Sequence, residues 1–197
     1  LGKPWSAKSF ALLGPFVIYN HHRMPHKEQE PQSLLERTLE HMRTSIQNTC
    51  PEVTPIVTYG TLIGNMRHGP GRCVDKDDDV DFWVHPDQWD SLRACMEKMY
   101  DNTPEHFAHK TPDFVSIQEP GLAQVDFYRL HRHSTSEHDL CDKWNNFRVP
   151  AAQVLPTSAS GGYHLPADPD AVLAAHYGPD WRTPKRKADL TYSYPGC

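Results

Sequence analysis

The chain has 197 residues, of which 38% are hydrophobic and 23% charged, and 20 Lys and Arg against 25 Asp and Glu give a formal net charge of −5. A chain of this length forms one domain of ordinary size around a hydrophobic core. The acidic balance excludes a general binder of nucleic acid, because affinity for a phosphate backbone depends on an excess of basic side chains. No apolar run approaches the ~20 residues that a membrane-spanning helix needs, so we expect membrane association only through a segment upstream of Leu1.

The composition divides the chain into three parts. Residues 1–30 are rich in Pro and His without a hydrophobic period, and we expect an irregular N-terminal arm. Residues 31–190 carry the periodic segments and are expected to form a single domain, followed by a C-terminal tail over 191–197. The cysteines are scattered, and we interpret them mainly as thiols, with one or two disulfides in an oxidising compartment. They are Cys50, Cys73, Cys95, Cys141 and Cys197.

The first periodic segment predicts an amphipathic helix. Apolar residues recur at helical spacing over residues 34–46, and Ser33 with Glu36 matches the S-x-x-E capping box. Pro51 and Pro55 end this helix. The next elements are predicted as a buried strand over Ile56–Tyr59, which ends at Gly60, and a helix over Leu62–Arg67.

Strands and helices continue to alternate along the rest of the chain. We expect a strand over Asp79–Val84, a helix over Trp89–Met99, an antiparallel pair of strands over Phe114–Ile117 and Ala123–Leu130, and a helix from Asp168 as N-cap to Gly178. Residues 134–162 are polar and are expected to form loops. These elements predict an α/β (α+β) fold with a short mixed sheet and flanking helices.

The densest group of chemically useful residues lies in residues 75–81, where five carboxylates occur within seven residues. Carboxylates this close repel one another unless solvent separates them or a positive charge holds them together. Asp79 and Asp81 are two residues apart on the predicted strand, so their side chains share one face, about 6.6 Å apart along the chain at ~3.3 Å per residue. Such a pair can share a hard divalent cation, and Mg²⁺ or Mn²⁺ suits its oxygen ligands. A solvated acidic loop remains the alternative.

Two further features fit around this pair. Asp126 lies in the apolar run over residues 125–128, where an acid is unfavourable unless it is paired with a base or bound to a metal. Gly60 and Thr61 stand at the head of a predicted helix, where backbone N–H groups and a hydroxyl can hold a phosphate. The sequence therefore suggests a phosphate site, a D-x-D pair on one strand and a third Asp on a neighbouring strand.

These residues resemble a known signature. The stretch over residues 59–69, YGTLIGNMRHG, followed by DDDVD over residues 77–81, resembles the LicD/fukutin-related family, whose members read roughly W/Y-G-T-L-L-G-x-x-R-H-x and then D-D-D-I-D or D-H-D-V-D. The likeness extends over about residues 34–185 and includes the family's closing element, here Pro166, Leu173, Tyr177-Gly178, Trp181 and Pro184. Asp75-Lys76 stands where many relatives have Pro-Trp, so we expect a donor pocket with different contacts to base or sugar.

The resemblance implies a nucleotidyltransferase-type fold and a phosphotransferase activity. In this interpretation, a phospho-alcohol such as phosphocholine or ribitol phosphate passes from a CDP-linked donor to a hydroxyl of a glycan or glycolipid, and CMP is released. The compartment would be the secretory pathway (Golgi lumen) for a eukaryotic protein and the cytoplasm for a bacterial one.

The resemblance also assigns roles to individual residues. Asp79, Asp81 and Asp126 would be the catalytic carboxylates that bind Mg²⁺ or Mn²⁺, with Asp126 as candidate base and Asp77 as a further candidate ligand. The donor phosphate would be held by Gly60, Thr61, Arg67 and Lys76, and Lys76 or Arg72 could take over part of the role of Arg67. An ion pair between Arg67 and the acidic run is the alternative for that residue.

Three other functions stay open. A nucleotidyltransferase would keep the same carboxylates and transfer the nucleoside monophosphate instead. A metal-dependent glycosyltransferase would use only the Asp79-x-Asp81 pair, and a catalytically silent carbohydrate-binding relative would need none of the carboxylates. Separately, His131, His133, His138 and Cys141 have a spacing that a structural Zn²⁺ could use.

Overall fold

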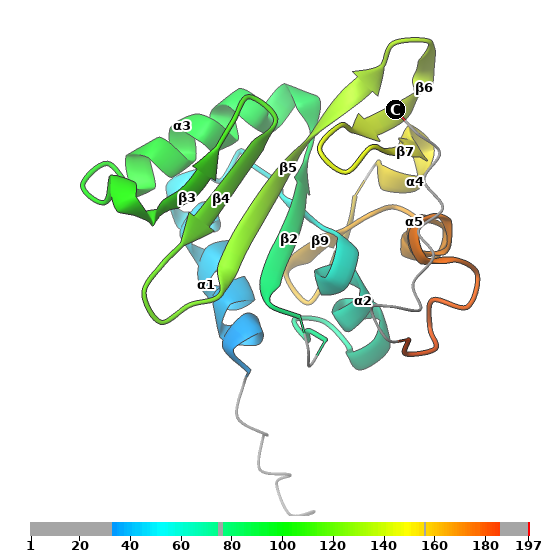
Figure 1. Ribbon diagram of the computed structural model, residues 1–197, viewed down its shortest axis with the longest axis horizontal. Helices are drawn as coiled ribbons and strands as arrows, with labels where there is room; N and C mark the ends of the chain where they lie inside the picture. Colours follow the sequence, from blue (N-terminus) through cyan, green and yellow to red (C-terminus); the bar gives the residue numbers. More distant parts are fainter. Residues whose placement is uncertain (1–32, 75–76, 156, 186–196) are drawn as a thin grey trace, which may run out of the picture. The chain divides into compact units, whose positions relative to one another are not determined.

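The computed structural model describes residues 33–74, 77–155, 157–185 and 197 (Figure 1). These described residues belong to one compact unit. The arm predicted over residues 1–30 lies outside the described residues, as does all of the predicted tail except Cys197. Among the described helices, none combines the length and the apolar character needed to cross a membrane.

The first helix, α1 (Leu34–Thr49), confirms the predicted capping box. Glu36 N–H donates to Ser33 Oγ over 3.2 Å, and Ser33 N–H donates to Glu36 Oε2 over 3.0 Å. The apolar stripe of α1 is buried, with Leu39 and Met42 fully enclosed. The helix therefore begins where the sequence predicts and docks through its predicted face.

A mixed β-sheet forms the centre of the unit. Its strand order is β3-β4-β5-β2-β1-β9-β8, and β5 extends beyond this layer to pair with β6, which pairs with β7. The strands are β1 (Ile56–Val57), β2 (Asp79–Val84), β3 (Phe107–Lys110), β4 (Phe114–Gln118), β5 (Gln124–His133), β6 (Ser136–Asp142), β7 (Phe147–Pro150), β8 (Ser158–Ser160) and β9 (Tyr163–Leu165). Parallel pairing of β2 with β5 and antiparallel pairing of β4 with β5 make the sheet mixed, so the expected fold class is confirmed.

Helices cover both faces of the sheet. Helices α1 and α3 (Trp89–Met99) lie behind the sheet in Figure 1, and α2 (Tyr59–His68) lies in front, with α5 (Pro169–Tyr177) beside it. Behind the sheet, Phe82 of β2 stacks on Phe127 of β5 with ring centroids 5.3 Å apart. A short helix, α4 (Ala151–Val154), connects β7 to the last part of the chain. Much of the front face of β3, β4 and β5 carries no helix (Figure 1).

Two predictions about the elements are wrong. Residues 134–162 are not a loop, because they contain β6, β7, α4 and β8. The polar side chains of β6 hide its period, and only its last three residues are buried. In addition, Tyr59 begins helix α2 rather than ending a strand, and the N–H of Leu62 already donates to the carbonyl of Thr58 over 2.9 Å. Gly60 and Thr61 thus belong to the first turn of a helix that starts three residues earlier than predicted.

The cysteines are mainly disulfide-bonded rather than thiols, and the two disulfides match the number that the sequence left open. Cys50 in the cap of α1 forms a disulfide with Cys95 of α3, and Cys141 of β6 forms one with Cys197. Cys73 is a buried thiol. The first disulfide joins the two helices behind the sheet, and the second ties the end of the chain to β6.

Candidate active site

Three carboxylates converge where β2 begins. Asp77, Asp79 and Asp81 each offer an oxygen, and these three oxygens all lie within 4.8 Å of one another; we call these residues the acidic triad. Asp81 is only 5% exposed, and the other two are half-buried. Asp78 of the same run is exposed. The run is therefore not a uniformly solvated loop, because its members differ in burial and three of them share one small volume.

The sheet adds a fourth carboxylate from the neighbouring strand. Asp126 of β5 lies directly opposite Asp81 in the parallel register of β2 and β5. The hydroxyl of Tyr128 lies 3.3 Å from both Asp81 Oδ1 and Asp126 Oδ2 and can donate its single proton to either, so these two oxygens lie at most about twice that distance apart. Asp126 is 5% exposed, and its Oδ1 accepts from Gln124 Nε2 over 3.0 Å. The in-register pairing brings Asp81 and Asp126 together, because paired residues of neighbouring strands point to the same face.

The electrostatics of this group favour a bound positive charge. Burial raises the pKa of Asp81 well above its usual value, and the nearby charges of Asp79, Asp77 and Asp126 raise it further. Burial and then the carboxylates raise the pKa of Tyr128 in the same way. Oxygen ligands of this kind suit Mg²⁺ or Mn²⁺, and a divalent cation would relieve the repulsion between them. The residues present therefore fit a hard divalent metal.

Helix α2 begins directly against the acidic triad. The N–H of Thr58 donates to the carbonyl of Asp81 over 3.1 Å, and the N–H of Asp81 donates to Thr61 Oγ1 over 2.9 Å. Thr61 is 1% exposed, so in this structure its hydroxyl positions Asp81 from within the fold. A Cβ added at Gly60 would lie 1.7 Å from an oxygen of Asp77, so this close approach needs glycine. The first turn of α2, where the sequence predicts phosphate binding, thus lies beside a carboxylate of the triad.

The basic residues assigned to the donor phosphate lie in different places. Nη2 of Arg67 donates to the carbonyls of Trp181 and Thr183, which follow α5. Arg72 pairs with Glu36 of α1, with Nε 3.0 Å from Oε1. Lys76 lies outside the described residues. The phosphate-binding role of Arg67 and Lys76 therefore stays a prediction, and the guanidinium of Arg67, on α2, contacts the segment that follows α5.

A buried polar network around Asp142, which the sequence pattern did not indicate, lies beside the site. Asp142, at the end of β6, is fully buried and accepts from Tyr59 Oη over 2.5 Å and from Trp83 Nε1 over 3.0 Å. Tyr59 has a φ of 46°, which is unfavourable for a residue with a side chain. Its ring lies 5.4 Å from that of Tyr128. This network links the start of α2 to the hydroxyl that touches both buried carboxylates, and it depends on pairing between strands that the sequence pattern did not reveal.

Alternation along β5 could have identified Tyr128. It lies two residues after Asp126, and side chains at that spacing point to the same face of a strand. Asp142 had no comparable signal, because its segment was interpreted as a loop.

The zinc-site hypothesis is contradicted at one ligand. The sulfur of Cys141 is bonded to Cys197 and is not available as a thiolate. Nε2 of His131 lies 3.0 Å from Asp113 Oδ1. Within the described part of the chain, the grouping of carboxylate, thiol and imidazole ligands that can hold a metal is the acidic triad.

Comparison with known proteins leaves the family open. No family model and no curated protein matches the chain. Among solved structures, the lincosamide antibiotic adenylyltransferase LnuA, with lincomycin bound, is similar at 9% identity and a TM-score of 0.43, over 66% of this chain and 78% of that one. The terminal uridylyl transferase 4 from Trypanosoma brucei, with bound GTP, is similar at 12% identity and a TM-score of 0.35, over 50% of this chain and 32% of that one. Both are nucleotidyltransferases, but likenesses this slight carry no argument about the activity of this chain.

Proposed function

We propose that this protein is a metal-dependent transferase that moves a phospho-alcohol from a CDP-linked donor to a hydroxyl of a glycan, with release of CMP. The observation that carries the proposal is the convergence of the acidic triad with Asp126 from the adjacent strand, at the start of helix α2. The CDP-linked donor and the glycan acceptor come from the resemblance of residues 59–69 and 77–81 to the LicD/fukutin-related signature.

The carboxylates divide into two roles. Asp79 and Asp81, with Asp77 beside them, would hold Mg²⁺ or Mn²⁺, which when bound neutralises charge on the donor's phosphate oxygens. The start of α2 would orient a phosphate group, since the positive end of a helix favours an anion. Asp126 would accept the proton of the acceptor hydroxyl. Tyr128 and Gln124 both contact Asp126, so its carboxylate is held in a fixed orientation.

The reaction balances as a displacement at phosphorus. The acceptor oxygen forms a bond to the phosphorus that carries the alcohol, the bond from this phosphorus to the CMP oxygen breaks, and CMP leaves with that electron pair. The proton of the hydroxyl passes to Asp126. Four of the five cysteines form disulfides, which favours an oxidising compartment for this reaction.

The test is release of CMP from a panel of CDP-alcohols with Mn²⁺ and glycan acceptors. Wild-type protein should release CMP, and EDTA should stop the reaction. Asp79→Asn and Asp126→Asn should each reduce the rate at least about 100-fold, whereas Asp78→Asn, which changes an exposed member of the same run, should keep it. Equal rates with and without EDTA would remove the metal mechanism.

The mass of the modified acceptor identifies the group transferred. Phosphocholine or ribitol phosphate on the acceptor supports the proposal. A cytidylyl or adenylyl group on the acceptor, with nucleoside triphosphate as donor, would instead make the protein a nucleotidyltransferase that uses the same carboxylates.

A further inference from the structure

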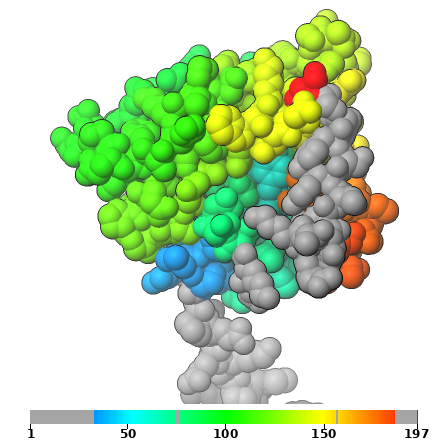
Figure 2. All heavy atoms as spheres, in the orientation of Figure 1, coloured from blue at the N-terminus to red at the C-terminus, as the bar shows by residue number. Residues whose placement is uncertain are grey.

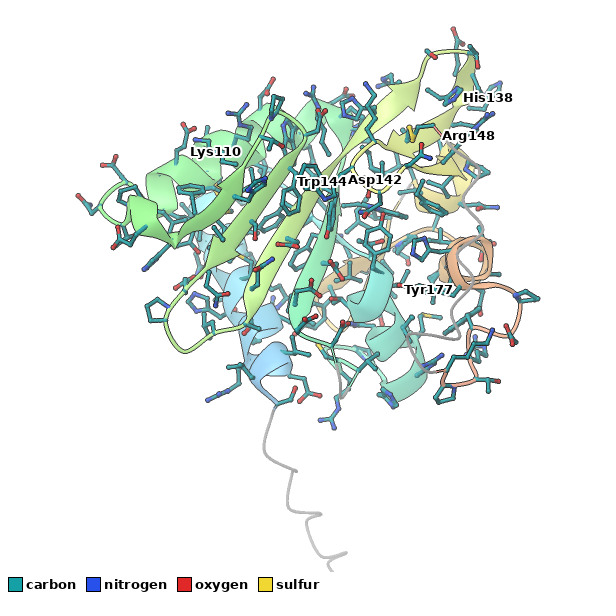
Figure 3. All side chains as sticks on the ribbon, viewed as in Figure 1. Lys110, His138, Asp142, Trp144, Arg148 and Tyr177 are labelled. Atoms are coloured by element: carbon teal, nitrogen blue, oxygen red, sulfur yellow. A yellow bond between two sulfur atoms is a disulfide. The ribbon has the colours of Figure 1, made fainter. Side chains whose placement is uncertain are left out.

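An exposed aromatic side chain stands on the open front face of the sheet, at some distance from the carboxylates. Trp144, in the turn between β6 and β7, is 47% exposed, and it is one of two large hydrophobic side chains exposed to this degree in the described part of the chain. Figure 3 shows it beside Asp142, over β4 and β5. Figure 2 shows the yellow β6–β7 region against the green strands of this face. A single exposed apolar side chain is ordinary on a protein surface, so what distinguishes Trp144 is how the neighbouring rings hold it.

The indole of Trp144 is held in place. It stacks on Phe114 of β4, with ring centroids 4.3 Å apart and an angle of 14° between the planes. His109 of β3 lies 5.8 Å away at an angle of 65°. Phe114 itself is buried, so it gives the indole a rigid support. One side of the indole therefore lies against Phe114, while nearly half of the side chain remains accessible.

The same ring stack leads to the carboxylates. Phe114 lies 5.1 Å from Tyr128, and the hydroxyl of Tyr128 is 3.3 Å from oxygens of both Asp81 and Asp126. Trp144, Phe114 and Tyr128 thus form a continuous row of rings, which we call the aromatic row. Two rings separate Trp144 from the carboxylates, so a ligand on Trp144 would contact the protein at a point remote from the reacting atoms.

The order of the strands assigns this side of the site to the acceptor. Helix α2 packs on β2, and its first turn lies against Asp77. Phe114 lies on β4, on the opposite side of β5 from β2. In a displacement at phosphorus the attacking and leaving oxygens are roughly in line, on opposite sides of the phosphorus. If the leaving nucleotide is oriented by α2, the acceptor must approach from the side of Asp126 and β4.

We propose that Trp144 is the binding platform for a sugar ring of the acceptor. This sugar ring would be separated from the reacting hydroxyl by at least the width of two rings, those of Phe114 and Tyr128. This inference rests on the proposed function. The face of an indole carries negative charge, which attracts the weakly positive C–H groups on the apolar face of a pyranose. The exposed imidazole of His109 lies beside Trp144 and can bind a hydroxyl at the edge of such a ring. Contacts far from the reacting atoms supply binding energy that selects the acceptor.

Binding is tested first, by the indole N–H signals of the full chain labelled with ¹⁵N-tryptophan. The chain has five tryptophans, and Trp144→Phe identifies the signal of Trp144 by its loss. The probes are lactose, maltose, mannobiose and N,N′-diacetylchitobiose, and separately CDP with Mg²⁺. We expect at least one disaccharide to shift the Trp144 signal, and CDP with Mg²⁺ to leave it in place. A shift by CDP with Mg²⁺ and by no disaccharide would make Trp144 a base-stacking residue, and no shift by any disaccharide would likewise overturn the proposal.

Variants test the same inference by kinetics. Trp144→Ala should raise the KM for a glycan acceptor about tenfold, and Trp144→Phe should restore most of the loss, since a phenyl ring keeps an aromatic face. The KM for the CDP-alcohol should stay within about twofold, because the donor lies on the other side of the carboxylates. Leu34→Ala removes the other large exposed hydrophobic side chain and should change neither value.

The outcomes separate this inference from the function on which it rests. Disaccharide binding at Trp144 without CMP release from any donor would leave the platform and remove the proposed transfer. CMP release with an unchanged acceptor KM in Trp144→Ala would leave the transfer and remove the platform.

Discussion

Replacing Asp81 by Asn gives the sharpest test of the electrostatics of the site. The change removes one of three negative charges whose oxygens lie within 4.8 Å. Two unit charges at that distance repel by about 3.5 kcal/mol at an effective dielectric constant of about 20. Asp81 relieves part of this repulsion by holding a proton, since its pKa is raised. We therefore expect Asp81→Asn to raise the free energy of unfolding of the metal-free protein by about 1–3 kcal/mol at neutral pH, or roughly 2–4 °C in Tm per kcal/mol.

The direction of the pH dependence follows from the raised pKa. The folded protein keeps a proton on Asp81 that the unfolded chain releases, so this group's contribution to stability is present below its ordinary pKa. That contribution is lost as the pH rises through the folded-state value. The advantage of Asp81→Asn over wild type should accordingly be small near pH 4 and grow toward pH 8.

A divalent cation should reverse the order of stability. Mn²⁺ at 100 times its dissociation constant would stabilise the wild-type protein by about 2.7 kcal/mol, because it binds the folded state alone. Asp81→Asn should lose most of this gain, since it lacks the buried ligand. Thermal unfolding in EDTA and in Mn²⁺, at pH 5 and pH 8, measures both effects, and Asp78→Asn is the matched control because that carboxylate is exposed. The reasoning is refuted by a variant that is less stable than wild type in EDTA and gains as much from Mn²⁺.

Three further predictions concern the surroundings of the site. Gly60→Ala should displace the carboxylate of Asp77, since the new Cβ would lie 1.7 Å from its oxygen. Calorimetry should show that the affinity for Mn²⁺ falls about tenfold, while the free energy of unfolding changes by less than about 1 kcal/mol. An unchanged affinity for Mn²⁺ would contradict this. Replacing Cys50 and Cys95 together by Ser opens a loop of 45 residues and should lower the free energy of unfolding by about 3–4 kcal/mol in urea titration; a loss below about 1 kcal/mol would argue that the disulfide has no structural role. Burial lowers the pKa of His176 to about 4. Between about pH 6.5 and pH 4 the unfolded chain therefore binds a proton at this residue, whereas the folded protein does not. The free energy of unfolding should fall by about 3 kcal/mol as the pH is lowered across that window. His176→Phe should remove this part of the acid sensitivity, and an identical pH profile in the variant would refute the assignment.

The sequence by itself determined the elements whose side chains repeat at the period of one buried face. Helix α1 begins at its capping box, α3 and α5 have the predicted positions, and β2, β4 and β5 pair in part as expected. The sequence also identified the D-x-D pair, Asp79 and Asp81, because side chains two residues apart on a strand point to the same face regardless of tertiary context.

The sequence also suggested Asp126 as a third carboxylate on a neighbouring strand, but only the tertiary structure decided how that strand pairs with the strand of the D-x-D pair. The parallel register of β2 and β5 puts Asp126 opposite Asp81, and this depends on pairing between segments more than 40 residues apart. The same holds for β6, whose polar side chains show no period of their own, and for Asp142, which becomes a buried acceptor only when β6 pairs with β5. The pattern of a short segment indicates which side of a helix or strand is buried. Which strands pair in a sheet depends on how the whole chain packs, so it cannot be predicted from one short segment.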